Sequence, residues 1–467
     1  MKNKYIKGIV LLGLTASMGL TSCQVTNRYK SPEVNTDSLF RDRPSTDTVT
    51  IANMTWCEYF KDPVLQELIE EGLQNNFDLQ IAVTRIQQAE ANLGMAKAAY
   101  FPDVSLVGQA EHSRSSNGVD GKDVLGYHST TYTLGVSTSW ELDVWGKLNR
   151  QSKAKYAQFL NSHAYHNLIK TSLVANIATS YYSLLALDEQ LKITKETVIL
   201  LEESTTTMQA LMEAGMLNGA SVEQSKSLLY STRVTIPDLE SQIRQMENSI
   251  STLLGRKPGH VVRATISDQM IVSRLAYGVP AQLLAKRPDV QQAELGFRSA
   301  FELTHAARAA FYPSITLTSG MIGYGASSLS NFFKPENIFA SIIGGLTQPI
   351  FAKKQLTGNL KIAKAQQQEA LLTFEKTVLS AGEEVSNILY SYESSISKNE
   401  IRESQISSLN KAVDFTQELL KAGEANYTEV LTAEQNLLQA QLGQVSDKLE
   451  QLQCSVDLYK ALGGGIQ

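Results

Sequence analysis

The chain has 467 residues, of which 43% are hydrophobic and 19% are charged, and these proportions are ordinary for a folded protein. The formal net charge of -5 at pH 7 gives no basic surface, which argues against nucleic acid as a partner. Beyond the N-terminus no window approaches about 18 uninterrupted apolar residues, so the sequence predicts no membrane-spanning helix.

The N-terminus has the pattern of a secretory signal that ends at a cysteine. Three lysines precede a short apolar run, and Leu-Thr-Ser-Cys follows at 20–23. A basic start, a short apolar core and small residues before a cleavage point are typical of a signal peptide. Because the small pair is followed by Cys23, this region resembles the bacterial lipoprotein box, in which the cysteine is acylated. We expect a lipid anchor on Cys23, the alternative being a plain signal peptide with an incidental cysteine.

Two halves of the chain follow one plan, which we interpret as an internal tandem repeat. At a spacing of 211 residues, the matching pairs include Asp78 with Asp289, Ala89 with Ala300, Pro102 with Pro313 and Leu106 with Leu317. At a spacing of 208 residues, they include Gly215 with Gly423, Asn218 with Asn426, Leu229 with Leu437 and Gly255 with Gly463.

Each half is predicted to begin with a helix and two strands. In the first half, the helix at 78–101 is stopped by Pro102, because proline lacks the amide donor and restricts the residue before it. Alternating apolar and polar residues then predict half-buried strands. The predicted strands are at 104–113, 131–142, 315–325 and 338–348. Pro102 and Pro313 therefore mark two helix-to-strand junctions.

Two long helices complete each half. Apolar residues at helical spacing predict helices at 147–213 and 355–421, and each ends at Ala-Gly, a common C-terminal stop. Helices of roughly 65 residues would be about 97 Å long, which suggests coiled-coil packing. Return helices are predicted at about 219–254 and about 427–462. Pro237 is expected to kink or break the first return helix.

Four strands of about ten residues can cross a bilayer, but four strands cannot close a barrel. An open sheet edge in lipid leaves backbone groups unpaired at several kcal/mol each. The strands therefore form a soluble sheet, or several chains combine them. Three chains would supply twelve strands, enough for a barrel with a lumen, together with twelve long helices that would form a hollow cylinder.

The chain resembles the outer membrane factor (TolC-like) family, and within it the lipoprotein branch of outer membrane efflux channels. The resemblance covers nearly the whole mature chain. Its motifs are NRYKSPE at 27–33, the segment WCEYFKDPVLQELIEEGLQNNFDLQIA at 56–82, WELDVWGKL at 140–148, LLGRKPG at 253–259, LLAKRPDVQQAE at 283–294 and LTQPIF at 346–351. One departure is Ala-Lys-Lys at 352–354, where the family usually has glycine after Pro-Ile-Phe, and this change can alter the strand-to-helix turn.

The resemblance implies a mainly α fold with β structure. It implies a trimeric outer-membrane β-barrel, with four strands per chain and twelve in all, continuous with a long periplasmic α-helical barrel. The expected domains are a signal peptide at 1–22, a lipidated segment at 23–61, a first repeat at 62–260, an equatorial linker at 261–280 and a second repeat at 281–467.

The implied function is that of a passive duct for small toxic compounds such as drugs, dyes or metal ions. Its partners would be two further copies of the chain, a periplasmic membrane-fusion adaptor, an inner-membrane exporter of the RND or ABC type, and outer membrane lipid. No enzymatic motif, cofactor fingerprint or metal-spaced cluster is evident. Two alternatives stay open: a duct for type I protein or peptide secretion, and a structural lipoprotein without a pore.

The resemblance also assigns site residues. The adaptor-docking tips would be the turns containing Ala214, Gly215, Asn218, Ala422, Gly423 and Asn426. The first acid of the family's narrow ring corresponds to Glu429 and the second to Thr432, so one of two acids is kept. Three copies of Glu429 around a bore would favour cations, with Glu424 as a second candidate for the lumen. A solvated glutamate on a helix surface is the alternative.

Several other residues have a structural interpretation. Cys57 and Cys454 are read as two separate, partly buried thiols. The pair His163 and His166 lacks an evident third metal ligand and is read as a surface pair. Two adjacent tyrosines, Tyr181 and Tyr182, are expected in helix interfaces, whereas Trp140 and Trp145 are expected near the membrane rim.

Overall fold

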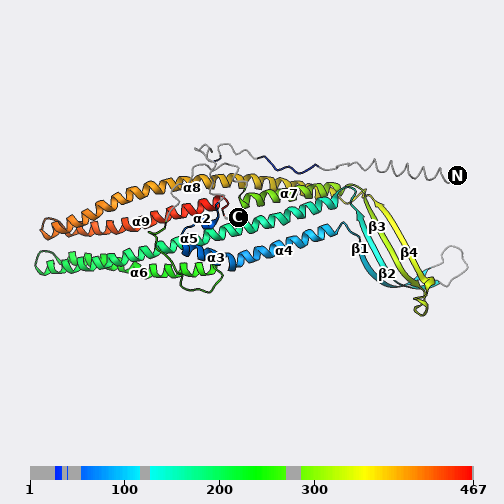
Figure 1. Ribbon diagram of the computed structural model, residues 1–467, viewed down its shortest axis with the longest axis horizontal. Helices are drawn as coiled ribbons and strands as arrows, with labels where there is room; N and C mark the ends of the chain where they lie inside the picture. Colours follow the sequence, from blue (N-terminus) through cyan, green and yellow to red (C-terminus); the bar gives the residue numbers. More distant parts are fainter. Residues whose placement is uncertain (1–26, 34–38, 40–53, 116–126, 270–285, 465–467) are drawn as a thin grey trace. The chain divides into compact units, whose positions relative to one another are not determined.

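The computed structural model describes residues 27–33, 39, 54–115, 127–269 and 286–464 (Figure 1). Its first half contains α2 (Trp56–Tyr59), α3 (Pro63–Asn75), α4 (Phe77–Ala98), β1 (Asp103–Ser115), β2 (Tyr127–Leu142), α5 (Lys147–Glu213) and α6 (Gly219–Leu253). Its second half contains α7 (Pro288–Ala309), β3 (Ser314–Ala326), β4 (Ile338–Thr347), α8 (Gln355–Lys421) and α9 (Tyr427–Ala461), with two short 3-10 turns between β3 and β4. The predicted signal peptide, Cys23 and much of the predicted linker lie outside the described residues.

The predicted elements are confirmed with small changes of boundary. Both long helices begin and end where the sequence predicts, as α5 and α8. The first helix ends at Ala98 rather than at Phe101, and the amide of Phe101 donates to the oxygen of Ala98 at 2.9 Å in a turn. This early end follows from Pro102, which disfavours helical geometry in the residue before it. Pro237 lies inside an unbroken α6, so the predicted break does not occur.

The chain divides into two compact units, each assembled from three segments. The first unit comprises 1–33, 86–161 and 293–374, and it contains the sheet. The second comprises 34–85, 162–292 and 375–467, and it contains the helical turns at 214–218 and 422–426. Most of α5 and α8 belongs to the second unit.

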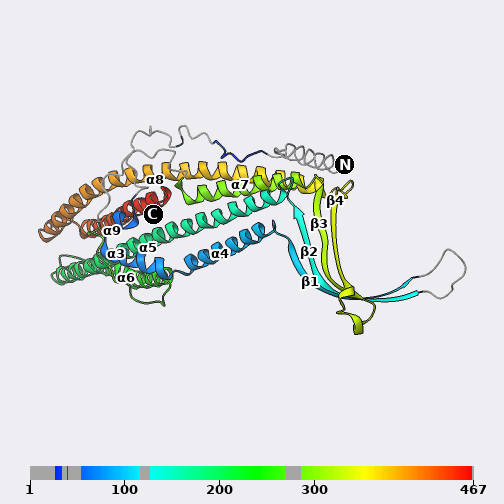
Figure 2. The ribbon, with the colours of Figure 1, turned by 45° about the vertical axis from the view of Figure 1, so that its right-hand side comes forward.

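The sheet is antiparallel, with the strand order β1-β2-β3-β4, and two views show the strands side by side (Figure 2). Within the described chain, β1 and β4 each have one unpaired edge. Directly opposed residues share a face of an antiparallel sheet. One face carries the apolar pairs Leu106 with Val136, Leu134 with Tyr324, and Val136 with Ile322. The other carries the polar pairs Ser105 with Ser137, Gln109 with Thr133, and Glu111 with Thr131.

The apolar face of the sheet is exposed. Leu106 is 74% exposed and Ile322 is 65% exposed, so the described residues of this chain do not cover them. A contiguous exposed apolar surface indicates contact with lipid or with another protein. Among the described residues, no helix combines the length and apolar character needed to cross a membrane.

In the second unit, α5 pairs with α6 and α8 pairs with α9 as two helical hairpins (Figures 1 and 2). Polar contacts fasten each hairpin. Thr205 and Ser225 join their hydroxyl oxygens at 2.7 Å between α5 and α6, whereas Arg402 Nε donates to Asp447 Oδ2 at 2.8 Å between α8 and α9. Both tyrosines at 181–182 are buried, which confirms their predicted place in helix interfaces. Tyr181 also donates to Asp62 Oδ2 at 2.7 Å.

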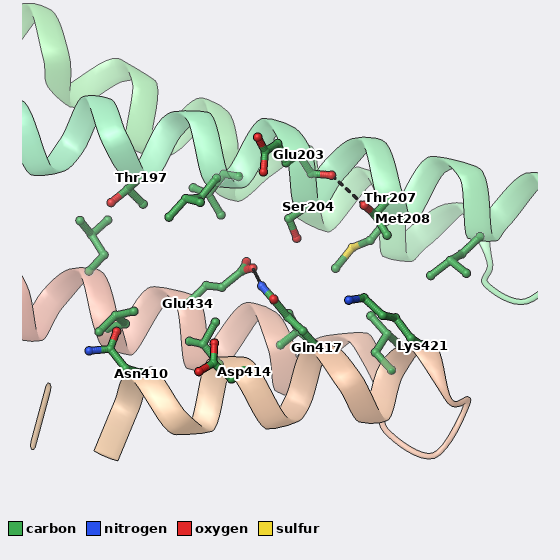
Figure 3. Close-up of a pocket in the computed structure, with 18 of the residues that line it drawn as sticks. Thr197, Glu203, Ser204, Thr207, Met208, Asn410, Asp414, Gln417, Lys421 and Glu434 are labelled. Atoms are coloured by element: carbon green, nitrogen blue, oxygen red, sulfur yellow. Dashed lines mark hydrogen bonds between the residues drawn. The ribbon is translucent and has the colours of Figure 1, made fainter. Parts of the chain in front are cut away.

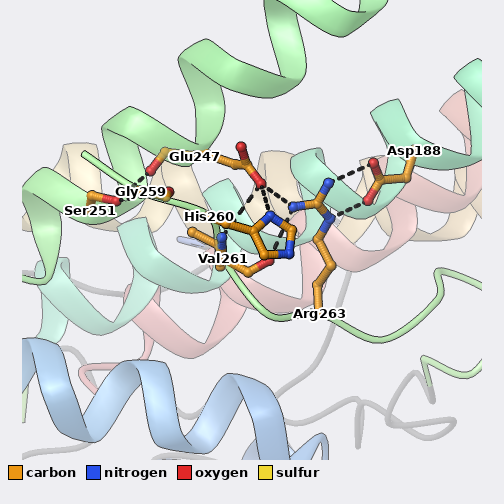
Figure 4. Close-up of polar contacts among 7 residues, drawn as sticks. All are labelled: Asp188, Glu247, Ser251, Gly259, His260, Val261 and Arg263. Atoms are coloured by element: carbon orange, nitrogen blue, oxygen red, sulfur yellow. Dashed lines mark hydrogen bonds and ion pairs between the residues drawn. The ribbon is translucent and has the colours of Figure 1, made fainter.

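A polar cluster holds the segment after α6 against the first hairpin (Figure 4). Arg263 ion-pairs with Asp188 of α5 and with Glu247 of α6, and its Nη2 lies 2.9 Å from Asp188 Oδ1. His260 Nδ1 lies 2.8 Å from the same carboxylate of Glu247. Burial acts to raise the pKa of Glu247, but hydrogen bonds from Arg263 and His260 outweigh it and leave that pKa below its ordinary value. These contacts therefore fix the start of the predicted linker to α5 and α6.

Candidate functional site

The two tip turns have the same backbone geometry. Gly215 and Gly423 adopt φ of 75° and 73°, a left-handed conformation that glycine enters without steric cost. In each turn the glycine amide donates three residues back and the next amide donates five residues back, which is the Schellman end of a helix. The predicted stop at Ala-Gly is thus confirmed at Ala214 and Ala422.

The asparagines of the tips begin the return helices. Asn218 Oδ1 accepts from the amide of Ser221 at 3.1 Å, and Asn426 Oδ1 accepts from the amide of Thr428 at 3.2 Å. These are N-caps, which satisfy amides that have no partner inside the helix. An apolar cluster lies beneath the turns and joins all four helices of the two hairpins. Its buried members are Met208, Val222, Leu420 and Val430.

The predicted gate residues lie at the start of α9 or in the turn before it. Glu424, Glu429 and Thr432 are all exposed. The hydroxyl of Thr432 donates to the backbone oxygen of Thr428 at 2.7 Å, so it is occupied within its own helix. In one chain these side chains lie together at the beginning of α9. Their role in lining a bore stays a prediction.

A third acidic residue, which the sequence interpretation missed, lies one turn farther along α9. Glu434 faces a cavity of about 400 Å³ between the two hairpins (Figure 3). Its Oε1 accepts from Gln417 Nε2 of α8 at 3.2 Å, while its Oε2 is buried without a hydrogen-bond partner. A signal was present in the sequence, because Glu434 follows Val430 by four residues and precedes Leu437 by three, which places it on the apolar face of the helix.

The two helix-to-strand junctions are tied to one short segment. Trp140 Nε1, near the end of β2, donates to the backbone oxygen of Tyr100 at 2.8 Å, two residues before Pro102. Trp145 Nε1 donates to the backbone oxygen of Pro313 at 2.7 Å, and its ring stacks on Tyr312 at a centroid distance of 5.0 Å. Both indoles thus anchor the junctions, and their place at a membrane rim stays a prediction.

The strand-to-helix turns differ between the halves. Gly146, just before α5, has φ of 76°, whereas the corresponding position before α8 is Lys354, with φ of 63°. Lys353 is also left-handed, with φ of 48°. Lys353 and Lys354 therefore keep a backbone conformation that favours glycine, at a cost in backbone strain.

The segment that follows the predicted lipidation site is docked on helices of the first unit. The backbone oxygen of Asn27 accepts from Arg150 Nη2 at 2.9 Å, and Arg150 Nη1 pairs with Glu302 Oε2 at 2.7 Å in a buried ion pair. Tyr29 and Ser31 donate to Glu294 Oε1 at 3.3 and 2.6 Å. Asn27 is four residues from Cys23, so a chain of this length can reach at most about 14 Å from the docked segment.

The Arg-Pro-Asp motif has a structural explanation. Arg287 Nη1 donates to the backbone oxygen of Ala461 at 2.8 Å, and its other nitrogens bond both oxygens of Asp289. Its Nη2 also pairs with Glu384 at 2.6 Å. In the first half the corresponding residue, Asn76, donates to the backbone oxygen of Leu253 at 2.9 Å. Each return helix therefore ends against a side chain from the start of its own half.

Cys57 and Cys454 are both free, as interpreted, but Cys57 is exposed rather than partly buried. It follows the N-cap of the short helix α2 by two residues and faces solvent. Burial raises the pKa of the Cys454 thiol to about 11. Among the residues that the structure places, no group of three or more histidine, cysteine, aspartate or glutamate residues could hold a metal ion.

Comparison with known proteins agrees with this architecture. The family model described as outer membrane efflux protein matches residues 68–256 and 279–464. The chain is 31% identical to the probable outer membrane lipoprotein SilC of Salmonella typhimurium over 418 residues, which is 88% of each chain. It is 30% identical to the toluene efflux pump outer membrane protein TtgC of Pseudomonas putida over 481 residues, covering 98% of this chain and 96% of TtgC.

Solved structures show the same arrangement of elements. A crystal structure of CusC, a protein called a cation efflux system protein in Escherichia coli, superimposes with a TM-score of 0.84 at 28% identity. The superposition covers 95% of this chain and 100% of that chain. The mainly helical fold with one sheet is therefore that of outer membrane efflux channels. Since the family model matches most of the sequence in two blocks, this chain belongs to the outer membrane efflux protein family.

Proposed function

We propose that the chain is the outer membrane channel of a tripartite efflux system. It forms a passive trimeric duct that carries small toxic compounds from an inner-membrane pump and a periplasmic adaptor across the outer membrane. The observation that carries this proposal is the single-layer sheet, with one exposed apolar face, one polar face and two open edges. Three such sheets would close a twelve-stranded barrel with lipid outside and water inside.

The equal lengths of the elements support an internal tandem repeat. Helices α5 and α8 have 67 residues each, and α6 and α9 have 35 each. Two hairpins per chain would give six in a trimer, arranged as a helical barrel. The domain boundaries at 62–260, 261–280 and 281–467 follow from this repeat and are part of the proposal.

The tip turns would receive the adaptor. Their residues are Ala214, Gly215, Asn218, Ala422, Gly423 and Asn426, and all of them are exposed. Glu429 would line the bore just past the second turn, together with Thr432 and Glu424. The inner-membrane partner would be of the RND type, with the ABC type as the second possibility. No enzymatic role, cofactor or resident metal belongs to this proposal.

The lipid anchor on Cys23 would fix the chain to the outer membrane. SilC is named an outer membrane lipoprotein, which supports the anchor. The docked segment at 27–33 adds support, because its contacts hold the chain close behind the predicted cysteine. Cys23→Ser should abolish labelling by radioactive palmitate. Continued labelling would show that another residue carries the lipid.

The purified mature protein in detergent tests the duct directly. It should behave as a trimer in light scattering and give discrete conductance steps in planar bilayers. A stable monomer without conductance would support the structural lipoprotein instead. Deletion of the gene should raise sensitivity to small toxic compounds, whereas loss of one secreted protein with unchanged drug sensitivity would favour type I secretion. The relatives named for toluene and cation efflux support the first outcome.

A further inference from the structure

The cavity between the two hairpins is a chamber built from one chain. It lies between α5, α8 and α9, and all of its lining belongs to the second unit. Its apolar walls include Leu201, Met208, Leu211, Leu420, Val430 and Leu437. A volume of about 400 Å³ is within the range of small-molecule sites.

One carboxylate projects into this apolar chamber. Glu434 extends from α9 toward α5, where Ser204 faces it, and Gln417 of α8 occupies one of its two oxygens (Figure 3). The other oxygen, Oε2, is buried and makes no hydrogen bond of ordinary geometry, although the Ser204 hydroxyl lies close enough to the carboxylate to lower its pKa. A buried acceptor without a donor costs free energy, so a ligand that brings a donor would remove that cost.

The charged residues around the chamber favour a ligand whose donor group carries a positive charge. Besides Glu434, the lining has two acidic residues, Glu203 and Asp414, and one basic residue, Lys421. Lys421 already pairs with Glu418 at 3.0 Å on the exposed surface. An anion would therefore be repelled, and a neutral donor would gain less than a cation, because hydrogen bonds between ions are the stronger ones.

From this geometry we propose that the chamber binds lipophilic organic ammonium ions, with the ammonium on Glu434 Oε2 and the apolar body against the leucine walls. The ligand would lie between α5 of one hairpin and α8 and α9 of the other, and so would join the two hairpins. The site requires the fold of a single chain and neither a trimer nor a conducting pore. Its test is thus separate from the test of the proposed function.

The first experiment compares two probes on the full mature protein in a non-ionic detergent. Isothermal titration calorimetry should show binding of 4-phenylbutylammonium, with at least about tenfold weaker binding of the uncharged 4-phenylbutanol. Glu434→Gln keeps the shape but removes the charge, and it should weaken the ammonium about tenfold or more while leaving the alcohol unchanged. Glu400→Gln, an exposed glutamate on α8 outside the cavity, is the matched control and should have no effect.

A second variant tests whether the probes bind inside the cavity, independently of the charge of Glu434. Ser204→Leu places a larger apolar side chain opposite Glu434 and should exclude both probes, with circular dichroism confirming that the helices persist. Equal affinity of the two probes for the unsubstituted protein would overturn the proposal. Equal affinity of Glu434→Gln and the unsubstituted protein for the ammonium would overturn it as well.

The pH profile identifies the carboxylate. Burial raises the pKa of Glu434, and its contacts with Gln417 and Ser204 oppose this only in part. Affinity for the ammonium should therefore rise with pH through that raised value, since only the ionised carboxylate pairs with the cation. The other charged residues that line the cavity are Glu203, Asp414 and Lys421. The double variant Glu203→Gln with Asp414→Asn should keep the profile, whereas a flat profile in the unsubstituted protein would contradict the proposal.

Discussion

Arg287 Nη1 donates to the backbone oxygen of Ala461 at 2.8 Å across 174 residues of sequence. The contact closes the second half of the chain, because Arg287 precedes α7 by one residue and Ala461 is the last residue of α9. Asn76 and Leu253 make the corresponding contact in the first half at 2.9 Å. A charged donor and a neutral donor thus perform the same task, which allows their strengths to be compared.

Arg287→Met should lower the free energy of unfolding by about 2–3 kcal/mol, because it leaves the end of α9 without its donor and Asp289 without its partner. Asn76→Leu should cost about 1–2 kcal/mol, since it removes two neutral hydrogen bonds, the one donated to Leu253 and the one that Oδ1 accepts from the amide of Leu79 at 3.1 Å. Arg256→Met is the control, because its partner Glu71 is on the surface, and it should cost less than about 1 kcal/mol. Denaturant titration of the three variants gives the comparison, and equal costs would contradict the argument.

The contribution of Arg287 should depend on pH. Burial acts to raise the pKa of Asp289, but the hydrogen bond and charge of Arg287 outweigh it and leave that pKa below its ordinary value. A depressed pKa adds stability above the unfolded-state value of about 3.9, and this stability is lost as pH falls through the folded value. The difference between Arg287→Met and the unsubstituted protein should therefore shrink below about pH 4.

Lys354→Gly should stabilise the protein by about 0.5–1 kcal/mol, because it relieves a left-handed lysine, and this gain exceeds the entropy that glycine adds to the unfolded chain. The matched change in the first half, Gly146→Lys, should destabilise by a similar amount. Thermal unfolding measures both. A loss of stability in Lys354→Gly would mean that the lysine side chain contributes more than its backbone costs.

Trp145→Phe should cost about 1–2 kcal/mol, because the backbone oxygen of Pro313 loses its indole donor while the stacked ring on Tyr312 is retained. Trp140→Phe should have a similar effect through Tyr100. Trp56→Phe is a control in the short helix α2, where no indole hydrogen bond is found among the described residues, and it should be near neutral. Denaturant titration compares the three variants. An unchanged free energy of unfolding in Trp145→Phe would mean that the indole hydrogen bond does not stabilise the junction.

Glu429→Gln should reduce the preference for cations in planar bilayers, because it removes one carboxylate per chain from the proposed bore. Reversal potentials in a salt gradient measure this preference. Glu418→Gln, an exposed acid on the last turn of α8, serves as the control. Unchanged selectivity in Glu429→Gln would place its carboxylate outside the conducting path.

The local signals in the sequence predicted much of the fold. Helical spacing, Pro102, the two Ala-Gly stops and Asn218 and Asn426 act over a few residues, so their consequences could be inferred along the chain. The contacts of Arg287 and Trp145 could not, since their partners lie 174 and 168 residues away. Glu434 was missed because its surroundings come from three helices, although its place on an apolar helix face was a usable signal.

The two indole contacts have a mechanical consequence. Trp140 and Trp145 lie five positions apart. Trp140 hydrogen-bonds the segment just before β1, whereas Trp145 hydrogen-bonds the segment just before β3. Because both helix-to-strand junctions are bonded to this one short segment, a rotation at one junction should be transmitted to the other. The two junctions should therefore open together. Amide hydrogen exchange at Tyr100 and at the neighbours of Pro313 should rise together or not at all.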